Sequence, residues 1–134
     1  MTIEAINRYC RNTFIDYLDI KFLDCGEGYI TARMPIGKNK LQPMGSLHGG
    51  ASLALAETVA SAGSFLLVDE TKFDVLGLQV IGNHVSTINS GAVVARAEIV
   101  HKGNITHIWD VTISDENGKL ISVARVTNII IEKK

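Results

Sequence analysis

Residues 47–67 read LHGGASLALAETVASAGSFLL, a run of Ala, Leu, Ser and Gly that predicts one long helix over residues 47–68. Glu57 is the only formally charged side chain between Lys40 and Asp69. A helix that is apolar on most faces is surrounded by other structure, and burying an unpaired carboxylate there costs roughly several kcal/mol. Glu57 is therefore a candidate functional residue on the central helix of the fold.

The segments on either side of this helix predict one more helix and several strands. Residues 3–18 carry apolar side chains close to a 3.6-residue period, which predicts a short amphipathic helix. Residues 19–35 predict a hairpin that turns at Cys25-Gly26-Glu27-Gly28, and the Gly and Pro residues of 37–46 predict a loop. Strands are predicted over residues 75–89, 92–101, 105–114 and 119–131, with a turn at Asn117-Gly118.

The order of these segments and the composition both predict a single α+β domain over residues 1–134. Helices and strands that are segregated along a chain form folds in which a long helix packs on one face of an antiparallel sheet. Hydrophobic residues make up 46% and charged residues 20% of the chain, the balance of a compact protein rather than a disordered one. Small residues of the long helix, such as Ala54 and Gly63, would let strands approach it closely.

Charge and hydropathy argue against several classes of partner. The net charge of −1 argues against a general nucleic-acid binder, which usually shows a basic excess. Residues 41–68 are long and apolar enough for a transmembrane interpretation, but they contain Glu57, Gln42 and four glycines. The N-terminus lacks the features of a secretory signal, and Cys10 and Cys25 form no CxxC motif. We therefore expect a cytoplasmic protein with reduced thiols, no nucleic-acid partner and no membrane span.

The spacing of polar residues on the helix predicts a groove that ends at the helix N-terminus. Gly50, Glu57, Ser61 and Ser64 share one stripe, which gives the carboxylate small and polar neighbours. The first N–H groups of a helix lack intrahelical partners, and glycine allows a ligand to approach closely. A thioester carbonyl bound there would develop its oxyanion against the Gly49 N–H, although the two glycines also suit plain helix–sheet packing.

Each candidate residue also has an ordinary structural interpretation. His48 suits a helix cap, and Glu57 suits an interface carboxylate satisfied by Ser61 and water. Gln42 suits an exposed loop residue, and His84 suits either a site-lining or a solvent-facing position on its strand. The two remaining histidines, His101 and His107, have no predicted partner.

Residues 41–57, LQPMGSLHGGASLALAE, resemble the HGG-containing helix start of hotdog-fold acyl-CoA thioesterases. The subgroup most similar to this segment is the phenylacetate-degradation and 4-hydroxybenzoyl-CoA thioesterase type, which places a Glu on the helix. The resemblance extends to Asn83-His84 and to residues 106–111 and 115–119. It implies a hotdog fold, in which an antiparallel sheet wraps one long central helix beside a short N-terminal helix, and a reaction that needs no cofactor or metal.

The resemblance also implies a role for each matching residue. Glu57 would be the nucleophile or the general base, and the Gly49 N–H would polarise the thioester carbonyl. His48 and Gln42 would orient the carbonyl or the water, and Ser61 would hold the water or Glu57. The implied substrate-binding residues are Gly50, Asn83, His84, Thr106, Lys102 and Arg125.

The family's assembly and its CoA contacts are further implications. Family members pair as dimers or dimers of dimers, and each active site draws Glu57 from one chain and the His48 loop from another. This chain has Asn104 where the family often has an Arg for CoA phosphates, so Lys102 or Arg125 would substitute.

The sequence therefore favours an acyl-CoA thioesterase that releases a free acid, aromatic or medium-chain, and CoA. A hotdog dehydratase or hydratase and a non-catalytic acyl-CoA sensor are the alternatives. Glu57 discriminates against the sensor, which needs no carboxylate in its groove.

Overall fold

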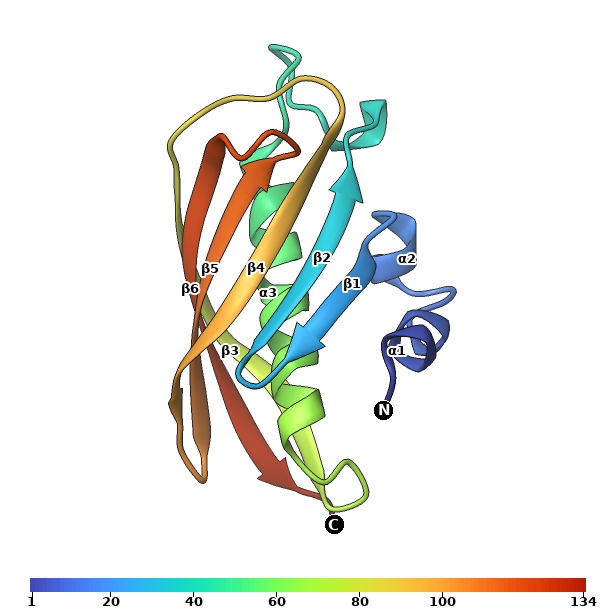
Figure 1. The fold of residues 1–134 in the computed structure, drawn as a ribbon, viewed down its shortest axis with the longest axis vertical. Helices are drawn as coiled ribbons and strands as arrows, with labels where there is room; N and C mark the ends of the chain where they lie inside the picture. Colours follow the sequence, from blue (N-terminus) through green and yellow to red (C-terminus); the bar gives the residue numbers. More distant parts are fainter.

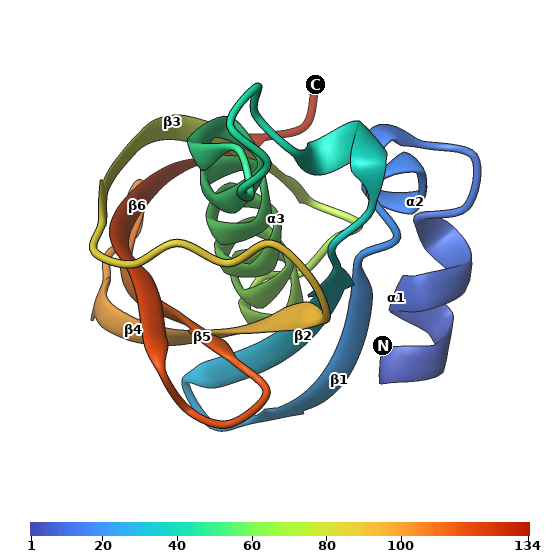
Figure 2. The same ribbon diagram turned by 90° about the horizontal axis from the view of Figure 1, so that it is seen from above.

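The computed structural model describes residues 1–134 and shows a long helix, α3 (Gly49–Leu67), held within a curved antiparallel sheet (Figures 1 and 2). The sheet has six strands in the order β1-β2-β4-β5-β6-β3. Their bounds are β1 Lys21–Gly26, β2 Tyr29–Pro35, β3 Phe73–His84, β4 Ala92–Lys102, β5 Thr106–Asp115 and β6 Leu120–Glu132. The predicted arrangement of a central helix wrapped by an antiparallel sheet is confirmed.

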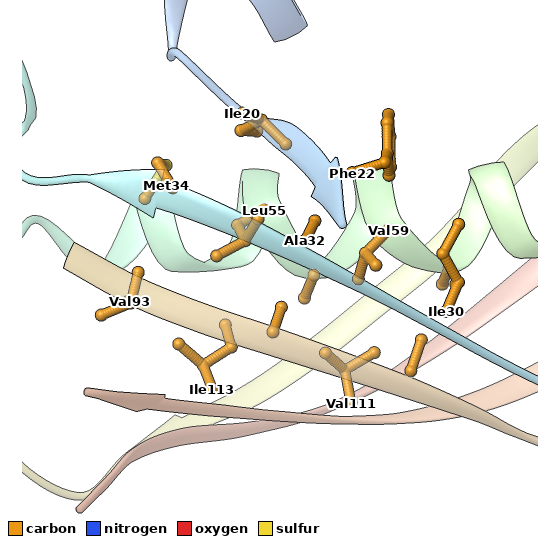
Figure 3. Packing of buried hydrophobic residues seen from close by; sticks show 14 of the residues in the cluster. Ile20, Phe22, Ile30, Ala32, Met34, Leu55, Val59, Val93, Val111 and Ile113 are labelled. Atoms are coloured by element: carbon orange, nitrogen blue, oxygen red, sulfur yellow. The ribbon is translucent and has the colours of Figure 1, made fainter. Parts of the chain in front are cut away.

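Buried side chains of α3 and of the concave face of the sheet form the core. Leu55 and Val59 lie one turn apart and face Ile30 and Met34 of β2 (Figure 3). Further along the helix, a Cβ at Gly63 would lie 2.5 Å from the Trp109 ring. Because a larger side chain at such positions would collide with the sheet, small residues allow the strands to lie close to the helix, as the sequence predicts.

The predicted short N-terminal helix is present, but residues 3–18 form two helices rather than the one continuous helix that the sequence predicts. α1 (Ile3–Tyr9) and α2 (Phe14–Tyr17) are separated by Asn12, whose positive φ of 62° cannot continue a right-handed helix. Both helices lie beside β1 (Figure 2). The Asn7 side chain fixes α1 there, because it accepts the Phe22 N–H at 2.9 Å and donates to the Phe22 carbonyl at 3.1 Å.

The ends of two other predicted elements also differ. The long helix begins at Gly49 because His48 is its N-cap, in extended conformation. β3 ends at His84 rather than at residue 89, because the N–H groups of Val85 and Ser86 both donate to the Ile121 carbonyl, which stops the regular ladder. The predicted loop over residues 37–46 contains one 3₁₀ turn, η1 (Lys38–Lys40).

α3 is the one helix long and apolar enough to cross a membrane by length and composition. In this fold the sheet curves around it, and Leu55, Ala56, Val59 and Ala60 are fully buried against the strands. Its apolar composition is therefore that of a core helix. Cys10 and Cys25 are both free thiols.

Candidate active site

Glu57 is half-buried in the wall of a cavity of about 500 Å³ between α1, α2 and α3. Most of the residues that line this cavity are hydrophobic, and the rings of Tyr9 and Phe65 stack there with centroids 5.9 Å apart. Ser61 lies one turn after Glu57 and lines the same cavity. The carboxylate therefore faces a space suited to a flat or short apolar group.

Gly77 of β3 is packed directly against the Glu57 carboxylate. A Cβ at Gly77 would overlap the carboxylate oxygen Oε2 and lie 3.0 Å from the carboxyl carbon. Only a glycine leaves the carboxylate in its observed position. Sequence reasoning missed this residue, although a glycine inside a strand pattern signals the close approach of another group.

The predicted polar stripe is only partly correct, because Ser64 does not line the Glu57 cavity. Ser64 is fully buried and contacts His107 and Trp109 of β5 and Asn128 of β6. The curved sheet covers the helix face at the level of Ser64 but leaves it open at the level of Glu57.

The start of α3 lines a second cavity, of about 260 Å³. His48 caps the helix, with its Nδ1 accepting the Gly50 N–H at 2.8 Å, so the proton of the neutral ring lies on Nε2. The Gly49 N–H makes no hydrogen bond within the chain. Gln42 also lines this cavity, and its side chain accepts the Met44 N–H, which closes the preceding loop.

His84 and Ser122 form the opposite wall of the second cavity. The Nδ1 of His84 lies 2.7 Å from the Ser122 hydroxyl. The Nε2 of the same His84 ring would lie 2.6 Å from a Cβ placed at Gly49. The imidazole is therefore held over the backbone whose N–H is free. The second cavity combines a free N–H with an imidazole and an amide, which is a set of groups able to bind a carbonyl oxygen.

The other predicted substrate-binding residues lie elsewhere on the chain. Successive strand residues point to opposite faces of a sheet, so Asn83 faces away from His84. Asn83 lies on the outer face beside Arg125, which forms two hydrogen bonds to Asp110 at 2.8 and 3.2 Å. The Asp110 carboxylate raises the pKa of Arg125 through these hydrogen bonds and its charge.

Two further residues of the predicted set lie near the β4–β5 turn. Lys102 ends β4 and is exposed, and Thr106 begins β5 and is half-buried. Gly50 is exposed in the first turn of α3, where its N–H is bound to the cap.

One chain does not bring the predicted catalytic residues together. Glu57 and Gly49 are eight residues apart on α3, which is about 12 Å along a helix axis. Glu57 and Ser61 line one cavity, and Gln42, Gly49 and His84 line another. The carboxylate and the free N–H thus lie at different levels of one helix and line different cavities.

His107, for which the sequence predicts no partner, is fully buried and lies 2.8 Å from the Ser64 hydroxyl. Burial lowers its pKa, and the charges of Lys102 and His101 lower it further. The pattern of β5 offers only a weak signal of this arrangement, namely that His107 alternates in phase with the buried Trp109.

Comparison with known proteins gives consistent matches over nearly the whole chain. Residues 44–122 match the thioesterase superfamily. The chain is 35% identical to the 1,4-dihydroxy-2-naphthoyl-CoA hydrolase of Escherichia coli, covering 98% of this chain and 96% of that protein. A crystal structure of a mutant thioesterase from Pseudomonas aeruginosa has a TM-score of 0.96 and 37% identity, covering 99% of this chain and 96% of that one. A thioesterase from Haemophilus influenzae has a TM-score of 0.94 and 38% identity, covering 98% and 92%.

Proposed function

Since the chain belongs to the thioesterase superfamily and is a hotdog-fold thioester hydrolase, we propose that it cleaves an aromatic or medium-chain acyl-CoA to the free acid and CoA. The observation that carries this proposal is the half-buried Glu57 carboxylate in the wall of an apolar, ring-lined cavity. The similarity to a hydrolase of an aromatic CoA ester supports the aromatic choice. We also propose that the chain is a thioesterase of the phenylacetate-degradation and 4-hydroxybenzoyl-CoA type.

In the proposed reaction Glu57 acts as the general base or the nucleophile. As a base it takes one proton from water while the water oxygen bonds to the thioester carbon, and the C–S bond then breaks with CoA leaving as a thiolate. The Gly49 N–H donates to the carbonyl oxygen as its charge develops. His48 and Gln42 orient the carbonyl, and Ser61 holds the water.

We propose that each active site is shared between two chains. The Gly49 N–H lies about 12 Å from the level of Glu57, so one thioester carbonyl cannot contact both within a single chain. β3 is an edge strand, and Leu76, Leu78 and Ile81 are exposed on it. Pairing of two β3 edges would cover these side chains and give an isologous dimer, alone or as half of a tetramer.

The remaining proposals concern the residues that contact CoA, the cellular location of the domain and its need for a cofactor. Gly50, His84 and Thr106 would contact the pantetheine end of the substrate. Asn83, with Lys102 or Arg125 as the cation, would contact the CoA phosphates. Residues 1–134 would act as one cytoplasmic domain with no cofactor.

A thiol-release screen tests the reaction. Short, long and aromatic acyl-CoA esters are supplied in turn, and free CoA is measured with a thiol-reactive dye. Release of thiol that is lost in Glu57→Gln supports the proposal. Tight binding of CoA esters without thiol release would indicate an acyl-CoA sensor, and hydration of an enoyl-CoA without release would indicate a hydratase.

A complementation experiment tests the shared site. Glu57→Ala and His48→Ala are each expected to be inactive or weak, and the two are then refolded together. Random pairing makes half of the dimers mixed, and each mixed dimer has one intact site, so about a quarter of all sites should work. Mixed dimers confirmed by mass spectrometry that stay as inactive as the separate variants would mean that each site lies within one chain.

A further inference from the structure

A buried polar cluster of Ser64, His107, Trp109 and Asn128 lies beneath α3, next to the Glu57 cavity. The Trp109 N–H donates to the Ser64 oxygen at 2.8 Å, and the Asn128 amide donates to the same oxygen at 3.0 Å. The Ser64 oxygen thus accepts two hydrogen bonds, and its own hydroxyl donates a hydrogen bond to Nδ1 of His107 at 2.8 Å. Every hydrogen-bonding group of Ser64 is therefore used, which holds the cluster in one arrangement.

The orientation of the Asn128 amide follows from its neighbours. Its nitrogen lies 3.3 Å from the Ala60 carbonyl, which can only accept a hydrogen bond, so this atom must be the NH₂ group. The amide oxygen then faces the Ser61 hydroxyl at 3.3 Å. Because an amide oxygen only accepts, Ser61 is the donor, and its proton points towards Asn128.

We propose that Asn128 is a positioning residue that sets the direction of the Ser61 hydroxyl, an inference that rests on the proposed thioesterase function. With its proton held by Asn128, Ser61 offers only oxygen lone pairs to the Glu57 cavity. It therefore cannot donate to the Glu57 carboxylate, and it acts as an acceptor for water. Asn128 itself is fully buried and does not line the cavity.

This arrangement orients the attacking water. A water molecule between Glu57 and Ser61 meets two acceptors, and it donates one proton to each. Its lone pair is then left free to bond to the thioester carbon, while the proton shared with Glu57 is the one that is transferred. If the Ser61 hydroxyl turned towards Glu57, the carboxylate would be occupied and the water would lose its second anchor.

The test measures kcat and KM for thiol release in five single variants and one double variant. Asn128→Leu and Asn128→Val both remove the acceptor, and Val also suits a strand. Both should lower kcat by about ten- to a hundredfold, as Ser61→Ala should, with little change in KM. Asn128→Asp keeps an oxygen facing Ser61, so it should retain most of the wild-type kcat even if its melting temperature falls.

Two measurements separate positioning from general loss of structure. In the Ser61→Ala background, Asn128→Val should cause no further loss of kcat, because its effect acts through the Ser61 hydroxyl. Ser64→Ala is the matched control: it disrupts the same buried cluster, but the Asn128 amide keeps its bond to the Ala60 carbonyl. This control should lower the melting temperature and leave kcat within about twofold.

The outcomes distinguish this inference from the function on which it rests. Wild-type kcat in Asn128→Val, or an equal further loss in the Ser61→Ala background, overturns the role of Asn128 while the thioesterase proposal stands. A wild-type protein that releases no thiol from any acyl-CoA overturns the proposed function, and the role of Asn128 with it.

Discussion

Replacing Gly77 by Ala should separate catalysis from stability. The new methyl group would overlap the Glu57 carboxylate oxygen and lie 3.0 Å from the carboxyl carbon, where ordinary contacts begin at 3.4 Å. The carboxylate must therefore move, by about 1 Å, and a displacement of that size costs about a hundredfold in rate. This corresponds to about 2.7 kcal/mol of transition-state free energy.

The same substitution should not destabilise the fold. Gly77 has no positive φ, so alanine can adopt its backbone conformation. Replacing a strand glycine by alanine at a compatible position stabilises a protein by about 0.4–1 kcal/mol through the unfolded chain. We therefore expect kcat to fall about a hundredfold while the melting temperature stays constant or rises slightly.

Gly82→Ala is the control for this experiment, because it makes the same change on the same strand. A Cβ at Gly82 would approach the flexible end of the Leu53 side chain at 2.6 Å and the Val123 carbonyl oxygen at 3.3 Å, rather than a carboxylate. Its kcat should stay near the wild-type value. A stable Gly77→Ala protein with wild-type kcat would show that the observed position of the Glu57 carboxylate does not matter for turnover.

Four further predictions follow from the site and its surroundings. Glu57→Gln should lower turnover by several orders of magnitude while CoA-ester binding is retained, and His48→Ala should lower it less, as stopped-flow assays and binding titrations would show. Dialysis against EDTA should leave thiol release unchanged, because the proposed mechanism uses a carboxylate and a backbone N–H; inactivation with rescue by zinc or magnesium would contradict it. Benzoyl-type esters should be turned over faster than palmitoyl-CoA, because the stacked rings of Tyr9 and Phe65 line the acyl cavity. Burial lowers the pKa of His107 in the folded chain, so as pH falls below about 6.5 the unfolded chain takes up a proton at a higher pH than the folded chain does. The free energy of unfolding should therefore decrease as pH falls below about 6.5. His107→Gln should flatten this pH dependence in thermal melts.

The central helix and the strands could be predicted because their signals are local. The long Ala- and Leu-rich run predicts α3, and the lone charge within it draws attention to Glu57. Alternating hydrophobic residues predict the strands after the helix, and Asn117-Gly118 predicts the turn between β5 and β6. The resemblance around His48 and Gly49 adds the hotdog fold, which the structural matches confirm.

The features that sequence reasoning missed depend on contacts between distant parts of the chain. Ser64 follows the same helical stripe as Glu57, yet the sheet covers one and leaves the other open to a cavity. The packing of Gly77 against Glu57 and of Asn128 against Ser61 joins positions 20 and 67 residues apart. No local pattern encodes which polar residues meet across such distances. The break at Asn12 is a local event, but asparagine adopts a positive φ only in some contexts.

The separation of Glu57 from Gly49 has a chemical reason within the proposed mechanism. A carboxylate in the first turn of α3 would be attracted to the free N–H groups there and would occupy the donor that the thioester oxygen needs. Glu57 lies more than two turns further along, beyond the reach of that interaction, and the Gly49 N–H stays unbonded. Both groups thus stay available for substrate, but about 12 Å apart they can act on one carbonyl only if the second chain supplies one of them. On this argument, the proposed pairing of two chains would serve the chemistry as well as cover the exposed β3 edge.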